Sequence, residues 1–168
     1  TSGKKFDTAY AKKSAQKSVS GFTLIELLVF LAVFILLIPV FWGSLSGYRD
    51  RQLLSTGTET VLSALSEARA KTVSSESGNQ FGAYFDSGRV VIFQGTVFTE
   101  PNSTNREFKL ESGITISSVS LAGSASTTVF RKITGDTANY GTVTLSLKKD
   151  PAKTKIISIS ATGTVSGQ

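Results

Sequence analysis

The sequence predicts an α+β protein in which a long N-terminal hydrophobic helix packs on a C-terminal antiparallel β-sheet domain. Three patterns support this fold class: an apolar run over residues 22–42, an apolar stripe at helical spacing over 54–68, and a series of short alternating segments beyond it. These patterns divide the chain into a basic leader at 1–21, a helix at 22–72 and a β-rich extracytoplasmic domain at 73–168.

The apolar run contains 21 residues, of which only Thr23 and Glu26 are polar. As a helix rising about 1.5 Å per residue it would reach roughly 30 Å, the thickness of a bilayer hydrocarbon core. A carboxylate in such a segment costs on the order of 2.5–3.5 kcal/mol on insertion scales, so a single one indicates a specific partner. The alternative is a carboxylate near the membrane edge that snorkels to water. Pro39 interrupts the helical hydrogen bonds and predicts a kink.

The charges before the run indicate its orientation. The leader holds five lysines and one aspartate, a net charge of +4, whereas the remainder holds 13 basic and 11 acidic residues, a net of +2. The positive-inside rule then leaves the N-terminus in the cytoplasm and the residues after about 43 outside. A cleaved secretory signal peptide is the competing interpretation, but its apolar region is usually only about 7–15 residues long.

The junction between leader and run carries a family resemblance. Gly21-Phe22-Thr23-Leu24-Ile25-Glu26 followed by an apolar segment resembles the processing site of type IV prepilins and type II secretion pseudopilins. The resemblance implies cleavage between Gly21 and Phe22 by an inner-membrane prepilin peptidase, which also N-methylates the new Phe22 amine. It further implies that Glu26 pairs with the N-terminal amine of a neighbouring subunit in a filament. Motif matches are hypotheses, and a plain signal anchor is the alternative.

Beyond the run, the helix continues in amphipathic form. Leu54, Val61, Leu65 and Ala68 recur at +7, +4 and +3, which places them on one helical face. Gly57 weakens the middle of this helix by about 1 kcal/mol relative to alanine. The apolar face is expected to pack against the strands that follow.

The remaining sequence is rich in short strands. Asp86-Ser87-Gly88 joins two apolar segments and predicts a hairpin. The expected strands are 81–85, 89–93, 107–110, 114–121, 127–131, 142–148, 156–160 and 162–165. This order of elements resembles that of minor pseudopilins of the GspH/FimT kind: a long helix comes first, then a hairpin, then more strands, and the chain closes with two strands separated by a glycine. Some of that group bind DNA through arginines around a C-terminal glycine, but Thr164, Val165 and Ser166 follow Gly163 here, so DNA is not expected as a partner.

The composition argues against catalysis. The chain has no histidine and no cysteine, so the commonest general base, the thiol nucleophile and the usual transition-metal ligands are missing. The acidic residues are scattered and lack EF-hand spacing. We therefore expect neither an enzyme nor a bound metal or cofactor.

One basic cluster stands near the C-terminus, where Lys148, Lys149, Lys153 and Lys155 surround Pro151. A hairpin would bring these lysines close together as a patch for DNA, anionic glycans or an acidic surface polymer. The competing and favoured interpretation is a solvated turn whose lysines guard a sheet edge against aggregation. No aromatic residue is interleaved to stack on bases, which further weakens the case for nucleic acid.

Together these patterns predict a pilin or pseudopilin, a structural subunit of a type IV pilus or type II secretion-like filament. Its expected partners are prepilin peptidase, other pilin or pseudopilin subunits and the inner (cytoplasmic) membrane, from which it would pass into a cell-surface filament. The alternative is a membrane-anchored surface adhesion or binding module that does not polymerise. Whether the subunit is major or minor is left open by the sequence.

Overall fold

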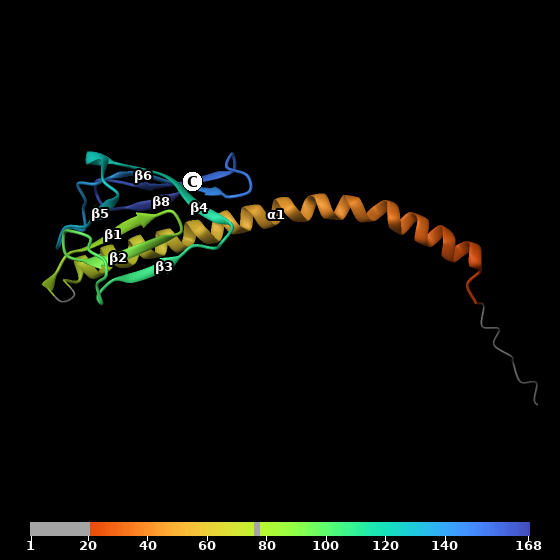
Figure 1. Cartoon of the computed structure of the whole chain (residues 1–168), viewed down its shortest axis with the longest axis horizontal. Coiled ribbons are helices and arrows are strands. Elements are labelled where there is room, and N and C mark those ends of the chain that lie inside the picture. Colours follow the sequence, from red (N-terminus) through yellow and green to blue (C-terminus); the bar gives the residue numbers. More distant parts are fainter. Residues whose placement is uncertain (1–20, 76–77) are drawn as a thin grey trace, which may run out of the picture. The chain divides into compact units, whose positions relative to one another are not determined.

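The computed structural model describes residues 21–75 and 78–168, apart from the side chains of residues 39–46. The chain divides into two units, Thr1–Trp42 and Gly43–Gln168, and each is described by itself. Figure 1 shows the element order along the chain, in which helix α1, Leu24–Val73, precedes all of the strands. The leader at 1–20 lies outside the described residues. Helix α1 includes Pro39, whose side chain is not described, and the kink expected there stays a prediction.

In the first unit, α1 begins with an N-cap, Thr23. The Thr23 hydroxyl accepts a hydrogen bond from the backbone N–H of Glu26 at 3.3 Å, and the Thr23 carbonyl accepts one from the N–H of Leu27 at 3.2 Å. A threonine followed three residues later by glutamate is the sequence signature of this start. The carboxylate also lies in the first helical turn, where it complements the helix dipole.

The apolar side chains that follow are exposed within this unit. Phe22 is 86% exposed, Leu36 is 75% exposed, and the large apolar side chains between them are all exposed by more than 45%. Across the described part of the chain, we found no helix that combines the length and the hydropathy required of a membrane span.

In the second unit, the described residues form two antiparallel four-stranded sheets. The first has the order β3-β2-β1-β5 and the second β4-β6-β7-β8, with a 3-10 turn, Ala122–Ser124, between β4 and β5. The strands are β1 (Phe81–Asp86), β2 (Arg89–Gln94), β3 (Arg106–Lys109), β4 (Ile114–Leu121), β5 (Thr127–Val129), β6 (Gly141–Leu147), β7 (Thr154–Ile159) and β8 (Val165–Gly167). The antiparallel β-rich domain expected from the sequence is confirmed, but its strands separate into two sheets.

Two turns illustrate how local sequence sets the strands. The predicted hairpin is present, with Asp86 opposite Arg89 across a two-residue turn. The final strand begins later than predicted, because residues 160–163 form a turn in which the N–H of Gly163 donates to the Ser160 carbonyl at 2.9 Å. Gly163 has a φ of 75°, a left-handed conformation that ends the extended run, so β8 starts only at Val165.

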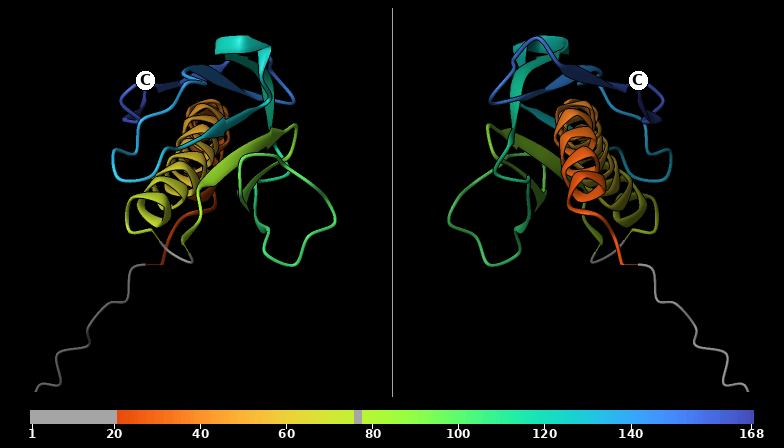
Figure 2. Two further views of the ribbon diagram at one scale, coloured as in Figure 1. Left: turned by 90° about the vertical axis from the view of Figure 1, so that its left-hand side faces the viewer. Right: turned by 90° about the vertical axis from the view of Figure 1, so that its right-hand side faces the viewer.

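The predicted apolar face of the helix is confirmed. Leu54 is 6% exposed, and Val61, Leu65 and Ala68 are fully buried in one core that includes side chains of both sheets. Figure 2 shows the yellow part of α1 lying against both sheets. Gly57 allows this close packing, since a Cβ there would lie 2.7 Å from Cδ1 of Ile114 on β4. The residue that weakens the helix is therefore the one that lets it approach the sheet.

Candidate functional site

The residues expected to be processed lie at the start of the first unit. Gly21 and Phe22 precede α1 outside any helix or strand, and both are exposed. Phe22, Glu26, Leu27 and Phe30 line a pocket of about 370 Å³ along one side of the helix. The Glu26 carboxylate therefore projects from an exposed apolar surface, where it is available to a positively charged group of another molecule.

The lysine hairpin lies in the second unit, in the connection from β6 to β7 and in β7 itself. Its arrangement differs from the patch of four free lysines considered above, because Asp50 of α1 engages two of them. Lys149 Nζ lies 2.5 Å from Asp50 Oδ1, and Lys153 Nζ lies 2.9 Å from Asp50 Oδ2. Asp50 is only 3% exposed. The contact ties the helix to the hairpin, and Lys148 and Lys155 have no ion pair among the described residues.

Sequence reasoning missed Asp50. Its partners lie about one hundred positions away in the chain, and no local pattern marks one aspartate between two arginines as paired. The only available signal was its place on α1: it lies four residues before Leu54, one helical turn upstream on the buried face.

The ion pairs shift the protonation equilibria on both sides. The Lys149 and Lys153 ammonium groups hold the pKa of Asp50 below its ordinary value of 3.8. Conversely, the Asp50 carboxylate raises the pKa of Lys153 above 10.5. The lowered pKa of Asp50 and the raised pKa of Lys153 arise from the same ion pair, so they represent one contribution to the stability of the fold.

A pH-dependent loss of stability is expected for Asp50→Asn. A carboxylate whose pKa is lowered on folding stabilises the fold above its ordinary pKa, and this contribution disappears as the pH falls through the folded value. The variant should therefore unfold at lower urea than the wild type at pH 7, and the difference between the two midpoints should shrink as the pH falls below 3.8, the ordinary pKa of an aspartate. Urea unfolding of both proteins at pH 7, 4 and 2.5 measures this. A gap that persists unchanged in acid would contradict the ion-pair explanation.

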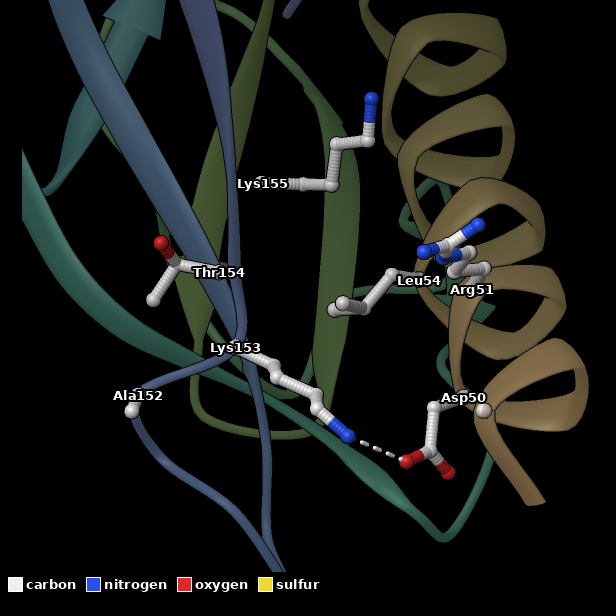
Figure 3. A pocket seen from close by; sticks show the side chains of 8 residues that line it. Asp50, Arg51, Leu54, Ala152, Lys153, Thr154 and Lys155 are labelled. Carbon is white, nitrogen blue, oxygen red and sulfur yellow. Dashed lines mark hydrogen bonds and ion pairs between the residues drawn. The ribbon is translucent and has the colours of Figure 1, made fainter. Parts of the chain in front are cut away.

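A pocket of about 480 Å³ opens beside this ion pair. Helix α1 contributes Gly47, Asp50, Arg51 and Leu54, and the hairpin and β7 contribute the other lining residues, Ala152, Lys153, Thr154 and Lys155. Figure 3 shows Lys153 turned toward Asp50, with Arg51 reaching from the helix and Lys155 from the strand. The lining therefore combines three cationic side chains, Arg51, Lys153 and Lys155, with one carboxylate, Asp50, and the apolar side chains of Leu54 and Ala152.

Three acidic residues that look scattered in the sequence converge on Arg89. Its guanidinium donates two hydrogen bonds of 2.9 Å to Glu100 and one of 3.2 Å to Asp86, and it lies 3.6 Å from Glu107. These contacts raise the pKa of Arg89. The three carboxylates therefore form ion pairs within one structural network. Among the described residues, no group of acidic side chains could hold a metal ion.

The comparisons with known proteins point to one fold. No family model and no curated protein matches the sequence. The minor pseudopilin EpsH from the type 2 secretion system of Vibrio cholerae matches with a TM-score of 0.51 and 15% identity over 68% of this chain and 95% of that one. The type IV minor pilin FimU of Pseudomonas aeruginosa matches with a TM-score of 0.52 and 15% identity over 68% of this chain and 92% of that one. The expected GspH/FimT-like resemblance is confirmed at the level of structure, and the chain has the fold of minor pilins and pseudopilins.

Proposed function

We propose that this chain is a minor pilin-like structural subunit of a type IV pilus or type II secretion-like filament. The observation that carries the proposal is the shared fold of the two solved neighbours, one a minor pseudopilin and the other a minor pilin. The processing motif at Gly21 and Phe22 is independent support from a part of the chain that the fold does not depend on.

In this proposal, the segment after the leader holds the subunit in the inner membrane, with its N-terminus in the cytoplasm, until assembly. Prepilin peptidase removes the leader after Gly21 and methylates the Phe22 amine. The second unit faces the outside of the membrane and provides contacts with other subunits. In this proposal, the subunit catalyses no reaction, and its role in the filament is structural.

Glu26 has two proposed tasks, one within the chain and one between chains. Its backbone N–H completes the capping contact with Thr23, and its carboxylate is then left on the exposed apolar surface. In a filament core, the Phe22 amine of an incoming subunit would be a buried cation, and an unpaired buried charge costs several kcal/mol. Glu26 is the only acidic residue between 22 and 49, so it is the residue of that segment that can supply the anion.

Replacing Gly21 with valine should leave a full-length, membrane-held precursor. The peptidase must bring its catalytic groups against a backbone that has no side chain in the way, and valine would add three carbons there. Intact mass and N-terminal sequence of the membrane fraction measure the outcome. The wild type should begin at methylated Phe22, and Ser20→Val, which adds similar bulk one residue earlier, should still be cut.

A mature-sized band from the Gly21→Val variant would remove the prepilin interpretation. An intact leader on the wild-type protein, in cells with an active prepilin peptidase, would favour the membrane-anchored binding module that never polymerises.

A further inference from the structure

The pocket beside Asp50 contains two cations that the ion-pair network does not use. Among the described residues, Arg51 and Lys155 have no carboxylate partner, while Lys149 and Lys153 are held by Asp50. Arg51 extends from α1 and Lys155 from β7, and both line the pocket (Figure 3). An arginine and a lysine in the lining of one pocket can bind a phosphate group, because guanidinium and ammonium together supply charge and several hydrogen-bond donors.

The charge of the surrounding surface reinforces the site. The two segments that supply the pocket, residues 47–54 and 148–155, contain six cations, Arg49, Arg51, Lys148, Lys149, Lys153 and Lys155, and two anions, Asp50 and Asp150, a net charge of +4. The rest of the second unit does not share this excess, since residues 43–168 hold 13 basic and 10 acidic residues, a net of +3, which leaves −1 for the remainder. The positive charge is therefore concentrated at this end of the unit.

The position of the site in the chain limits its distance from the apolar segment. The pocket's first lining residue, Gly47, comes five residues after Trp42, the last residue of the apolar run. Even fully extended, five residues reach no more than about 18 Å. If residues 22–42 are held in the membrane, the pocket stays close to the headgroup layer, where basic residues are attracted to the phosphates of anionic lipids.

We propose that this pocket binds the phosphate of an anionic phospholipid in the outer leaflet of the inner membrane. Arg51 and Lys155 contact the phosphate oxygens, and Leu54 lies against the glycerol or first acyl carbons. Asp50 is not a ligand here, because its role is to hold Lys149 and Lys153 in place and keep the hairpin beside the helix. This inference rests on the proposed membrane-held state, and it adds a lipid contact that the subunit must give up on entering a filament.

The pocket favours a lipid over a nucleic acid. None of its lining residues is aromatic, so bases would have no surface on which to stack. The two free cations also line one hollow, and a pair of cations is too short a series to follow successive phosphates of a strand.

The test uses the full chain purified in a neutral maltoside detergent with an equal mixture of phosphatidylglycerol and phosphatidylcholine. Native mass spectrometry then counts the lipids that each protein retains. The wild type should retain phosphatidylglycerol preferentially, and Arg51→Gln with Lys155→Gln should reduce that retention by about tenfold or more. The melting temperature of this variant should equal that of the wild type, because both side chains are exposed and make no ion pair among the described residues.

The charge-matched control removes one arginine and one lysine elsewhere, as Arg131→Gln with Lys132→Gln; these two residues contact Asp136 and the Gly78 carbonyl, respectively, and do not line the pocket. They lie close in sequence to Gly135, whose neighbours Arg69 and Val73 are 18 and 22 positions beyond Arg51 along α1. The control should retain phosphatidylglycerol as the wild type does. Equal loss in both variants, or no lipid preference in the wild type, would overturn the proposal.

Two competitors identify the source of the anion. Inorganic phosphate that displaces phosphatidylglycerol at equal concentration would overturn a lipid occupant, and so would retention of a short DNA duplex in its place at about 150 mM salt. Carbonate extraction of cell membranes tests the underlying proposed function separately. A chain that is released by carbonate refutes the membrane-held state, whereas a chain that resists extraction but shows no lipid preference refutes this inference alone.

Discussion

Gly163→Ala is expected to lower the free energy of unfolding of the second unit by roughly 3–4 kcal/mol. Gly163 has a φ of 75°, and a Cβ at this position would lie 1.8 Å from the carbonyl oxygen of Gly135. That oxygen already accepts a hydrogen bond of 3.1 Å from Arg69 Nε. The added methyl group must therefore displace the backbone of one loop and break the bond that joins this loop to α1. Urea unfolding followed by circular dichroism measures the change.

Gly78→Ala separates the two causes of that loss. Gly78 has a similar φ of 64°, but no atom would lie within 4 Å of its added Cβ. This variant should cost only the left-handed backbone conformation, about 1–2 kcal/mol. Equal costs at the two glycines would show that the collision with Gly135 relaxes without penalty.

Glu26→Leu is expected to give normally processed, membrane-bound protein that enters filaments poorly. Removing the carboxylate makes insertion of the segment easier by a few kcal/mol, and Gly21 and Phe22 are unchanged, so cleavage should survive. Assembly should fail because the Phe22 amine of the incoming subunit is left without an anion in the filament core. The measurement compares the mature band in membranes with the amount in sheared surface filaments.

Glu26→Gln is the control that distinguishes charge from a preference at the helix start. Glutamine, like glutamate, is favoured three residues after an N-cap threonine, but it carries no charge. If pairing with the amine is the reason for the glutamate, the glutamine variant should assemble as poorly as the leucine variant. Wild-type incorporation of the glutamine variant would assign the role of Glu26 to the helix start, and wild-type incorporation of both would remove the assembly mechanism.

Much of the second unit could be predicted from the sequence because its signals are local. A stripe at spacings of three, four and seven residues requires a helix with one buried face, and Val61, Leu65 and Ala68 are indeed fully buried. Asp86 and Gly88 mark a turn whose flanking residues alternate, and the hairpin forms there. In both cases, the residues that determine the element lie within it.

What could not be predicted depends on distant partners. Alternation shows that a segment has one buried face, but it does not show which strand lies beside it, and so the separation into two sheets was missed. From the local sequence, Gly57 only predicts a less stable helix. The reason for a glycine at this position is its close approach to Ile114, which lies more than fifty residues later in the chain. The same holds for the lysine hairpin, since its four lysines stand together in the sequence but the pairing of two of them with Asp50 could not be read from it.

The contact between Asp50 and the hairpin also has a consequence for the order of events in folding. It joins residues 103 positions apart, so it closes a long loop, whereas the β1–β2 hairpin closes locally. We therefore expect Asp50 to engage its lysines after the rate-limiting step. Asp50→Asn should then accelerate unfolding and leave the refolding rate nearly unchanged, which stopped-flow measurement of both limbs would reveal. The ion pairs of Asp50 would then slow unfolding and lengthen the lifetime of the folded subunit, and they would leave the rate of folding unchanged.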